Sequence, residues 1–286
     1  MRASTATVLL VGLLAPFALA APTVEKVLAP GGYRANTNLH EIPAGGSLAH
    51  VGTDIHIIAA NGTVVQKVTA GTPTKVKAAV SPLETGWVAY ASWLNTGSSA
   101  ISSFTTSWKV PPVPTANHGQ TVFLFNSIEP NSGTAILQPV LQYGPSAAGG
   151  GAFWAVASWY LDSSNTFFTT PVRTTAGTTL NGIITLTSSS GSSFNYNTQF
   201  TGISGTSLSI TGAAQLTWAT ETLEAYGVTT ISDYPAGSTV FSGINLKLAS
   251  GAVPSVSWSH VNDAADGLTT TINTNGATNA QVTITY

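Results

Sequence analysis

The sequence predicts an all-β fold, an antiparallel β-sandwich. Long runs with the 3.6-residue period of a helix do not occur, whereas short segments rich in Val, Ile, Thr and aromatic residues recur between clusters of Gly, Ser, Asn and Pro. Only 7% of the residues are charged, which argues against amphipathic helices with charged outer faces. Many short strands at this spacing are typical of a sandwich or barrel.

The first twenty residues have the pattern of a secretory signal peptide. Arg2 gives a positive start, Val8–Leu14 an apolar stretch, and Ala18–Ala20 a small-x-small cleavage site. We therefore expect a secreted, extracellular protein. No later stretch approaches the roughly 18 apolar residues of a membrane helix, so no membrane partner is expected. The chain has no cysteine, which excludes disulfides and thiolate metal sites.

Residues 21–85 are predicted to be a pro-segment or a β-rich N-terminal extension. Asp54–Ala60 and Thr63–Thr69 are joined by Asn61-Gly62, a strong hairpin pattern, and Asn61 also opens a glycosylation sequon. Gly71–Pro82 reads as a linker or surface loop because of its prolines.

The charges are unevenly distributed along the chain. Residues 1–83 hold six basic and three acidic groups, and residues 84–286 hold three basic and eight acidic groups. A basic segment ahead of an acidic domain favours an electrostatically docked pro-segment that acid releases, although a chance bias in a structural extension gives the same count. The absence of a basic patch excludes a nucleic-acid partner.

Residues 86–286 are predicted to form the sandwich. Its first strand is Gly86–Trp93, where Trp87, Ala89, Ala91 and Trp93 would lie on one face and Val88, Tyr90 and Ser92 on the other. The further predicted strands are Ser102–Val110, Thr121–Ile128, Thr134–Tyr143, Phe153–Leu161, Thr166–Val172, Thr179–Thr187, Ser193–Phe200, Leu208–Ile210, Gln215–Glu224, Thr239–Leu248, Val256–Trp258, Thr269–Asn273 and Gln281–Tyr286. Pro139 inside one of these strands predicts an edge position or a bulge.

Motifs for cysteine nucleophiles, zinc peptidases, calcium loops and nucleotide binding are absent, and we expect neither a metal nor a cofactor. A carboxylate and an amide remain as the chemistry-bearing pair. Glu221 lies in an apolar β segment, where burial would raise its pKa and suit it to proton transfer. Gln138 ends the run Ala135–Gln138 on another predicted strand, with Gln138 and Gln142 on one face. Glu224 would face the opposite side from Glu221.

Ala135–Gln138 and Trp218–Glu221 together resemble the paired signature of the fungal glutamic peptidases, the eqolisins. The resemblance implies a concanavalin A-like sandwich of two bent sheets with a concave ligand face. It also implies a monomeric acid endopeptidase in which Glu221 activates water and Gln138 stabilises the oxyanion. The chain departs from the family pattern at Phe125–Pro130, where Trp-Val-Gly-Ile-Asp-Gly is usual, and at Ser158, where an acid is usual.

Six residues are predicted to contact a polypeptide substrate on the concave face: Phe125, Glu129, Gln142, Trp154, Tyr160 and Trp218. Two other functions fit the same composition. One is a non-catalytic, lectin-like sandwich that binds polysaccharide through Trp and Asn or Gln side chains. The other is a glycosidase that uses two of Glu129, Glu221 and Glu224, whose carboxyl groups would then lie about 5–9.5 Å apart.

Overall fold

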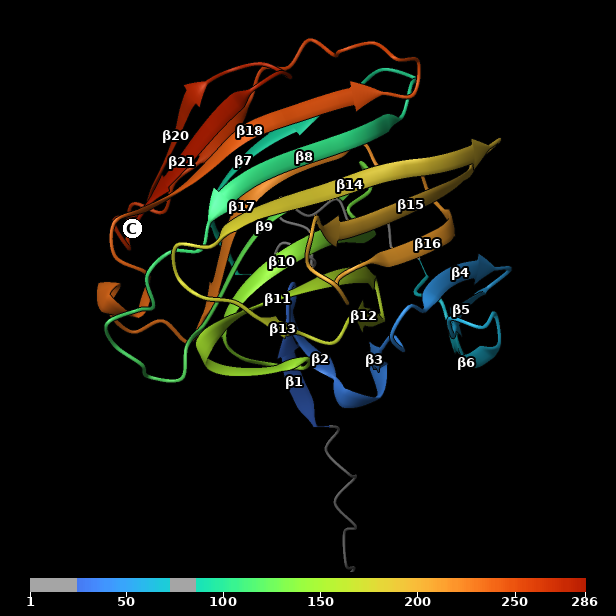
Figure 1. Cartoon of the computed structure of the whole chain (residues 1–286), viewed down its shortest axis with the longest axis horizontal. Helices are drawn as coiled ribbons and strands as arrows, with labels where there is room; N and C mark the ends of the chain where they lie inside the picture. Colours follow the sequence, from blue (N-terminus) through green and yellow to red (C-terminus); the bar gives the residue numbers. More distant parts are fainter. Residues whose placement is uncertain (1–24, 73–85) are drawn as a thin grey trace, which may run out of the picture.

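The protein is a β-sandwich, seen in a computed structural model that describes residues 25–72 and 86–286 (Figure 1). Residues 1–24 and 73–85, which include the predicted signal peptide and most of the predicted linker 71–82, lie outside the described residues. Within the described ranges the only helical elements are the short 3-10 turns Asn36–Asn38 and Ile231–Asp233. No helix in these ranges is long and apolar enough to cross a membrane.

Sheet I contains nine strands in the order β19-β7-β17-β9-β10-β11-β12-β3, with β13 beside β11. Its strands are β3 (Leu39–Glu41), β7 (Trp87–Leu94), β9 (Thr121–Glu129), β10 (Ala135–Ser146), β11 (Gly149–Asp162), β12 (Thr166–Phe168), β13 (Val172–Arg173), β17 (Trp218–Tyr226) and β19 (Ser259–Val261).

Sheet II contains ten strands in the order β20-β21-β18-β8-β14-β15-β16-β4-β5-β6. Its strands are β4 (Ser47–Val51), β5 (Asp54–Ile58), β6 (Val64–Thr69), β8 (Ile101–Lys109), β14 (Thr179–Ser190), β15 (Ser193–Phe200), β16 (Leu208–Ala213), β18 (Ser238–Leu248), β20 (Thr269–Thr274) and β21 (Ala280–Thr285).

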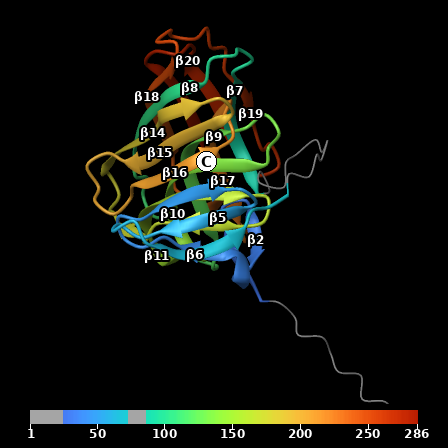
Figure 2. The same cartoon turned by 90° about the vertical axis from the view of Figure 1, so that its right-hand side faces the viewer.

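The N-terminal segment is part of the sandwich. Strand β3 pairs in parallel with β12 at one edge of sheet I, and β4 pairs in parallel with β16 in sheet II. Figure 2 shows β5 and β6 continuing sheet II beyond β16. Both sheets are therefore mixed rather than purely antiparallel as the sequence predicted. The β5–β6 hairpin with Asn61 in its turn is confirmed.

A separate hairpin, β1 (Lys26–Ala29) with β2 (Gly32–Ala35), lies against β10 on the face of sheet I that points away from sheet II (Figure 1). We call this face the outer face. Two apolar clusters lie on the two sides of sheet I. One fills the space between the sheets, and the other, on the outer face, joins Ala29 to Phe125, Val140 and Trp159.

Two expectations about strands were wrong. Pro139 lies in the central strand β10, without an edge position or a register shift at that residue; instead, the ladder to β9 skips Gln138 and Pro139 and resumes at Val140. A proline has no N–H to donate, so the interruption falls beside it. Val256–Trp258 is irregular, and the strand begins after it at Ser259; the backbone N–H of Trp258 donates to the side chain of Asn275 rather than to a neighbouring strand.

Candidate functional site

Alternation along β10 and β17 decides which side chains share a face of sheet I. Gln138 lies in step with Val140, which belongs to the outer-face cluster. Glu221 lies in step with Ala219 and Leu223, which belong to the cluster between the sheets. Because successive side chains of a strand point to opposite faces, Gln138 points to the outer face and Glu221 to the interior of the sandwich.

The surroundings of Glu221 confirm that it faces the interior. Its Oε1 accepts a hydrogen bond from the hydroxyl of Thr106, which lies on β8 of the opposite sheet. Its cross-strand neighbour is Asn126, which is also fully buried. Burial raises the pKa of Glu221 well above its ordinary value, and the Thr106 hydrogen bond opposes this only in part. The rise in pKa that the sequence predicted for Glu221 is therefore present, but the side chain faces the interior and not the outer face.

The Gln138–Glu221 pair expected from the sequence is consequently not brought together. The sheet itself separates the two side chains. The four-residue matches locate both strands correctly, but the match at β17 selects a residue one position out of phase with the outer face. As placed here, Glu221 is an interior, hydrogen-bonded carboxyl group.

Gln138 lies in a polar strip on the outer face. The register on either side of it sets Gln138 opposite Ser127 of β9, and Trp159 lies opposite on β11. The Ser127 hydroxyl is 2.7 Å from that of Thr220, which is 2.9 Å from that of Thr222. The Gln138 side chain is 1% exposed, and neither atom of its amide group has a hydrogen-bond partner among the described residues. A buried amide of this kind is able to bind an added polar group.

Glu129 is the acid nearest to Gln138 along this face. It lies on β9 two residues after Ser127, on the same face, and its partner across the ladder is Trp218. Diagonal neighbours of adjacent strands are separated by about 7–8 Å, so Glu129 and Gln138 lie near each other on the outer face. Glu129 is fully buried.

The six predicted substrate contacts divide between the two faces. Phe125 and Trp218 lie on the outer face with Glu129. Gln142 also lies there, but its amide bonds the carbonyl groups of Gly144 and Gly149 and so holds the β10–β11 hairpin.

Trp154 and Tyr160 were predicted to lie on the ligand face, and this prediction is wrong. Both belong to the cluster between the sheets, and the Tyr160 hydroxyl is 2.9 Å from Nε2 of His50. Their strand parity places Trp159, rather than either of them, beside Gln138. Ser158, at the position where the family has an acid, shares their parity and donates a 2.5 Å hydrogen bond to the carbonyl of Thr206.

Glu224 is an outer-face carboxyl on the same strand as Glu221. It was correctly expected to face away from Glu221. Its Oε1 accepts hydrogen bonds of 2.7 Å from the backbone N–H of Gly31 and from the hydroxyl of Tyr226. Burial raises its pKa to about 8, although these hydrogen bonds and the nearby Arg34 guanidinium favour the charged form. The pattern Ala219, Leu223 and Ala225, all on the parity of Glu221, could have indicated that Glu224 faces the ligand side.

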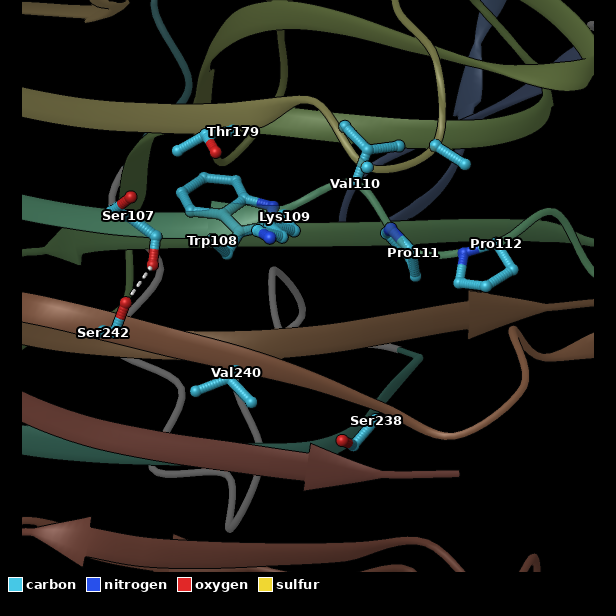
Figure 3. Close-up of a pocket in the computed structure, with 12 residues that line it drawn as sticks. Ser107, Trp108, Lys109, Val110, Pro111, Pro112, Thr179, Ser238, Val240 and Ser242 are labelled. Atoms are coloured by element: carbon cyan, nitrogen blue, oxygen red, sulfur yellow. Dashed lines mark hydrogen bonds between the residues drawn. The ribbon is translucent and has the colours of Figure 1, made fainter.

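Neither a metal site nor the groove on sheet II offers an alternative acid–base site in the described residues. No group of three His, Cys, Asp or Glu side chains in the described ranges could hold a metal ion. A groove of about 630 Å³ lies on sheet II between β8 and β18, and Figure 3 shows Lys109, Val240 and Ser242 among its lining residues. None of the residues that line it is acidic or a histidine, so it offers no acid–base group.

The comparisons with known proteins followed from the fold. No family model matches the chain, and no curated protein matches it. The structure is similar to solved structures of glutamic peptidases. Scytalido-glutamic peptidase with a peptide-based transition state analogue is 13% identical, with a TM-score of 0.47, and the match covers 70% of this chain and 98% of that chain. SCP-B, a member of the eqolisin family in complex with the tripeptide Ala-Ile-His, is 14% identical, with a TM-score of 0.45 and the same coverage.

Proposed function

We propose that this protein is a secreted endopeptidase that hydrolyses peptide bonds with an amide–carboxylate pair on the outer face of sheet I. The observation that carries the proposal is the placement of Gln138 and Glu129 as diagonal neighbours on that face, both buried beside the polar strip. The resemblance at Ala135–Gln138 supports the choice of reaction. Glu129 takes the role that the sequence assigned to Glu221.

In the proposed reaction, the Glu129 carboxylate removes a proton from a water molecule, which attacks the carbonyl carbon of the peptide. The Gln138 NH₂ group donates a hydrogen bond to the oxygen as it becomes negative, and its carbonyl oxygen holds the attacking water. Glu129 then returns the proton to the leaving amine. Loss of one oxyanion donor typically slows such reactions about 100- to 1000-fold. The resemblance at Ala135–Gln138 and Trp218–Glu221 implies an acid endopeptidase, so we expect activity at acid pH.

Access to the pair requires a change in the outer face. Glu129 and Gln138 are buried, and hairpin β1–β2 packs against the same face. Polypeptide substrate would therefore enter only where this face opens. Trp218, the cross-strand partner of Glu129, stacks on Trp87 at 5.8 Å and 21°, and this pair of rings would support an extended chain.

A glycosidase is disfavoured by the register of the strands. Glu221 faces the interior, which leaves Glu129 and Glu224 as the possible pair. Glu224 pairs with Phe123, six residues along β9 from Glu129, which separates the two by about 20 Å at about 3.3 Å per residue. The two classes of glycosidase need about 5–5.5 Å or about 6.5–9.5 Å.

A non-catalytic carbohydrate-binding sandwich is the second candidate. The Trp87–Trp218 pair beside the hydroxyl groups of Thr220 and Thr222 favours it, because sugar rings stack on indoles and bond to hydroxyl groups. Retention on a polysaccharide column, lost in Trp218→Ala, would support this candidate.

The deciding experiment compares wild type with three variants on a denatured protein substrate at about pH 3.5 and pH 7, with the peptides read by mass spectrometry. We expect Glu129→Gln and Gln138→Ala to lower kcat/KM at least about 100-fold, in line with the oxyanion-donor magnitudes. Glu221→Gln is the matched control, because an interior amide replaces an interior carboxyl of the same shape. Loss of cleavage in Glu221→Gln with retention in Glu129→Gln would overturn the pairing, and a folded wild type that cuts nothing at either pH would overturn the peptidase.

A further inference from the structure

The tip of hairpin β1–β2 is buried, which is unusual for a hairpin turn. Residues 28–32 are all buried, and Ala29 is enclosed with Phe125, Val140 and Trp159. Turn residues ordinarily lie in solvent because their backbone groups need water. Here the backbone is satisfied by sheet I instead. The carbonyl of Leu28 accepts a 2.7 Å hydrogen bond from the N–H of Ala147, in the turn between β10 and β11.

Glu224 is the group that receives the tip. Its Oε1 is 2.7 Å from the backbone nitrogen of Gly31, whose φ of +78° is a conformation that glycine adopts without strain. Tyr226 donates to the same oxygen, and the Tyr33 ring lies edge-on to the Tyr226 ring at 6.3 Å. The carboxyl therefore binds a backbone N–H of the hairpin, and the Arg34 guanidinium of the same hairpin lies near it.

A receptor for a backbone N–H on a ligand-facing sheet accepts other polypeptides with the same backbone shape. We propose that Glu224 anchors a polypeptide-binding subsite on the outer face, and that hairpin β1–β2 occupies this subsite as an intramolecular ligand that an incoming polypeptide displaces. The inference rests on the proposed function in one respect, namely that the displacing ligand is a polypeptide. The subsite accepts a tight turn with glycine at the position of Gly31.

The subsite is separate from the proposed reacting pair. Glu224 lies about 20 Å along the sheet from Glu129, so a chain held at both points would span about six residues in an extended conformation. The hydrophobic surface between them includes Phe123 and Phe125, which lie on β9 in step with Glu129. A substrate would thus be held at its turn by Glu224 and cut at a distance.

The test uses a disulfide to fix the hairpin in place. The chain has no cysteine, so Leu28→Cys with Ala147→Cys creates one possible pair. The backbone N–H of Ala147 lies 2.7 Å from the carbonyl oxygen of Leu28, so the two residues are in direct contact, as the formation of a disulfide requires. The probe is a blocked synthetic peptide with the sequence of residues 25–36, and its binding is read by the fluorescence of the nearby tryptophans at pH 7.

We expect the peptide to bind wild type and the reduced double variant, and to bind the oxidised double variant at least 10-fold more weakly. Leu28→Cys alone, under the same oxidising conditions, should bind as wild type does. Equal binding by the oxidised and reduced forms, or no binding by any form, would overturn the proposal. Glu224→Leu should weaken binding in the reduced form, because it removes the acceptor for the backbone N–H.

Cleavage is measured separately so that the two proposals can fail separately. If the disulfide controls peptide binding while Glu129→Gln still cleaves, the catalytic assignment is wrong and the subsite stands. If Glu129→Gln abolishes cleavage while the disulfide leaves peptide binding unchanged, the subsite is wrong and the catalytic pair stands.

Discussion

Replacing Glu224 with Gln should stabilise the protein at neutral pH. The carboxyl is fully buried, and burial raises its pKa from 4.5 to about 8, so the folded state holds it protonated at pH 7 while the unfolded state ionises it. The folded state therefore loses stability as pH rises from 4.5 toward 8. A glutamine keeps the shape and the acceptor oxygen for Gly31 and Tyr226, but it does not titrate.

The expected magnitude follows from the pKa. Each pKa unit corresponds to about 1.36 kcal/mol, and pH 7 lies about 2.5 units above the ordinary value of 4.5, which gives about 3 kcal/mol of stabilisation by Glu224→Gln at pH 7. At pH 4.5 the difference should be close to zero, because the carboxyl is then mostly protonated in the folded state and half protonated in the unfolded state.

Urea unfolding at pH 4.5, 5.5 and 7 measures this difference directly. Glu25→Gln, at an exposed position next to β1, is the matched control for the removal of one carboxyl group. If the difference in unfolding free energy between Glu224→Gln and wild type is the same at all three pH values, the assignment of a neutral Glu224 is refuted. If Glu224→Gln becomes less stable relative to wild type as pH rises, the predicted direction of the pKa shift is also refuted.

Two further changes test the packing of the N-terminal segment and of the interior. Burial lowers the pKa values of His40 and His50, so the stability that they support is present above about pH 6.5 and is lost as pH falls. His40→Gln with His50→Gln should therefore flatten the fall of the melting temperature between pH 6.5 and 5. Gly182→Ala should destabilise by about 1–3 kcal/mol in urea, because its Cβ would lie 2.4 Å from Oδ1 of Asn126, and an unchanged midpoint would show that the interior yields.

The strands were largely predictable because alternation and turn residues are local properties. The pairing of Gln138 with Glu221 was not, since a sequence match fixes a position but not the phase of a strand relative to its sheet. Glu221 shares its parity with Ala219 and Leu223, and this pattern alone indicated an interior side chain. Glu224 could not be recognised as an anchor, because its partner Gly31 lies 193 residues away in the chain.

The N-terminal extension was predictable as β-rich but not as a component of both sheets. Parallel pairing of β3 with β12 and of β4 with β16 joins residues that are far apart in sequence, so no local pattern reveals it. For that reason the predicted boundary at residue 85 does not separate two folded units, because strands from both sides of it pair in the same sheets. Whether the extension is removed stays a prediction.

The parallel pairing of β3 with β12 and of β4 with β16 determines what cleavage in the predicted linker would produce. Strands β3 and β4–β6 are the neighbours that the edges of β12 and β16 have in the described residues. An uncovered edge strand offers unpaired N–H and C=O groups to other chains, which promotes aggregation. A cut in the linker would therefore yield a stable two-chain molecule in which the severed fragment is retained as structural strands. Dissociation of that fragment would leave β12 and β16 as exposed edge strands that promote aggregation.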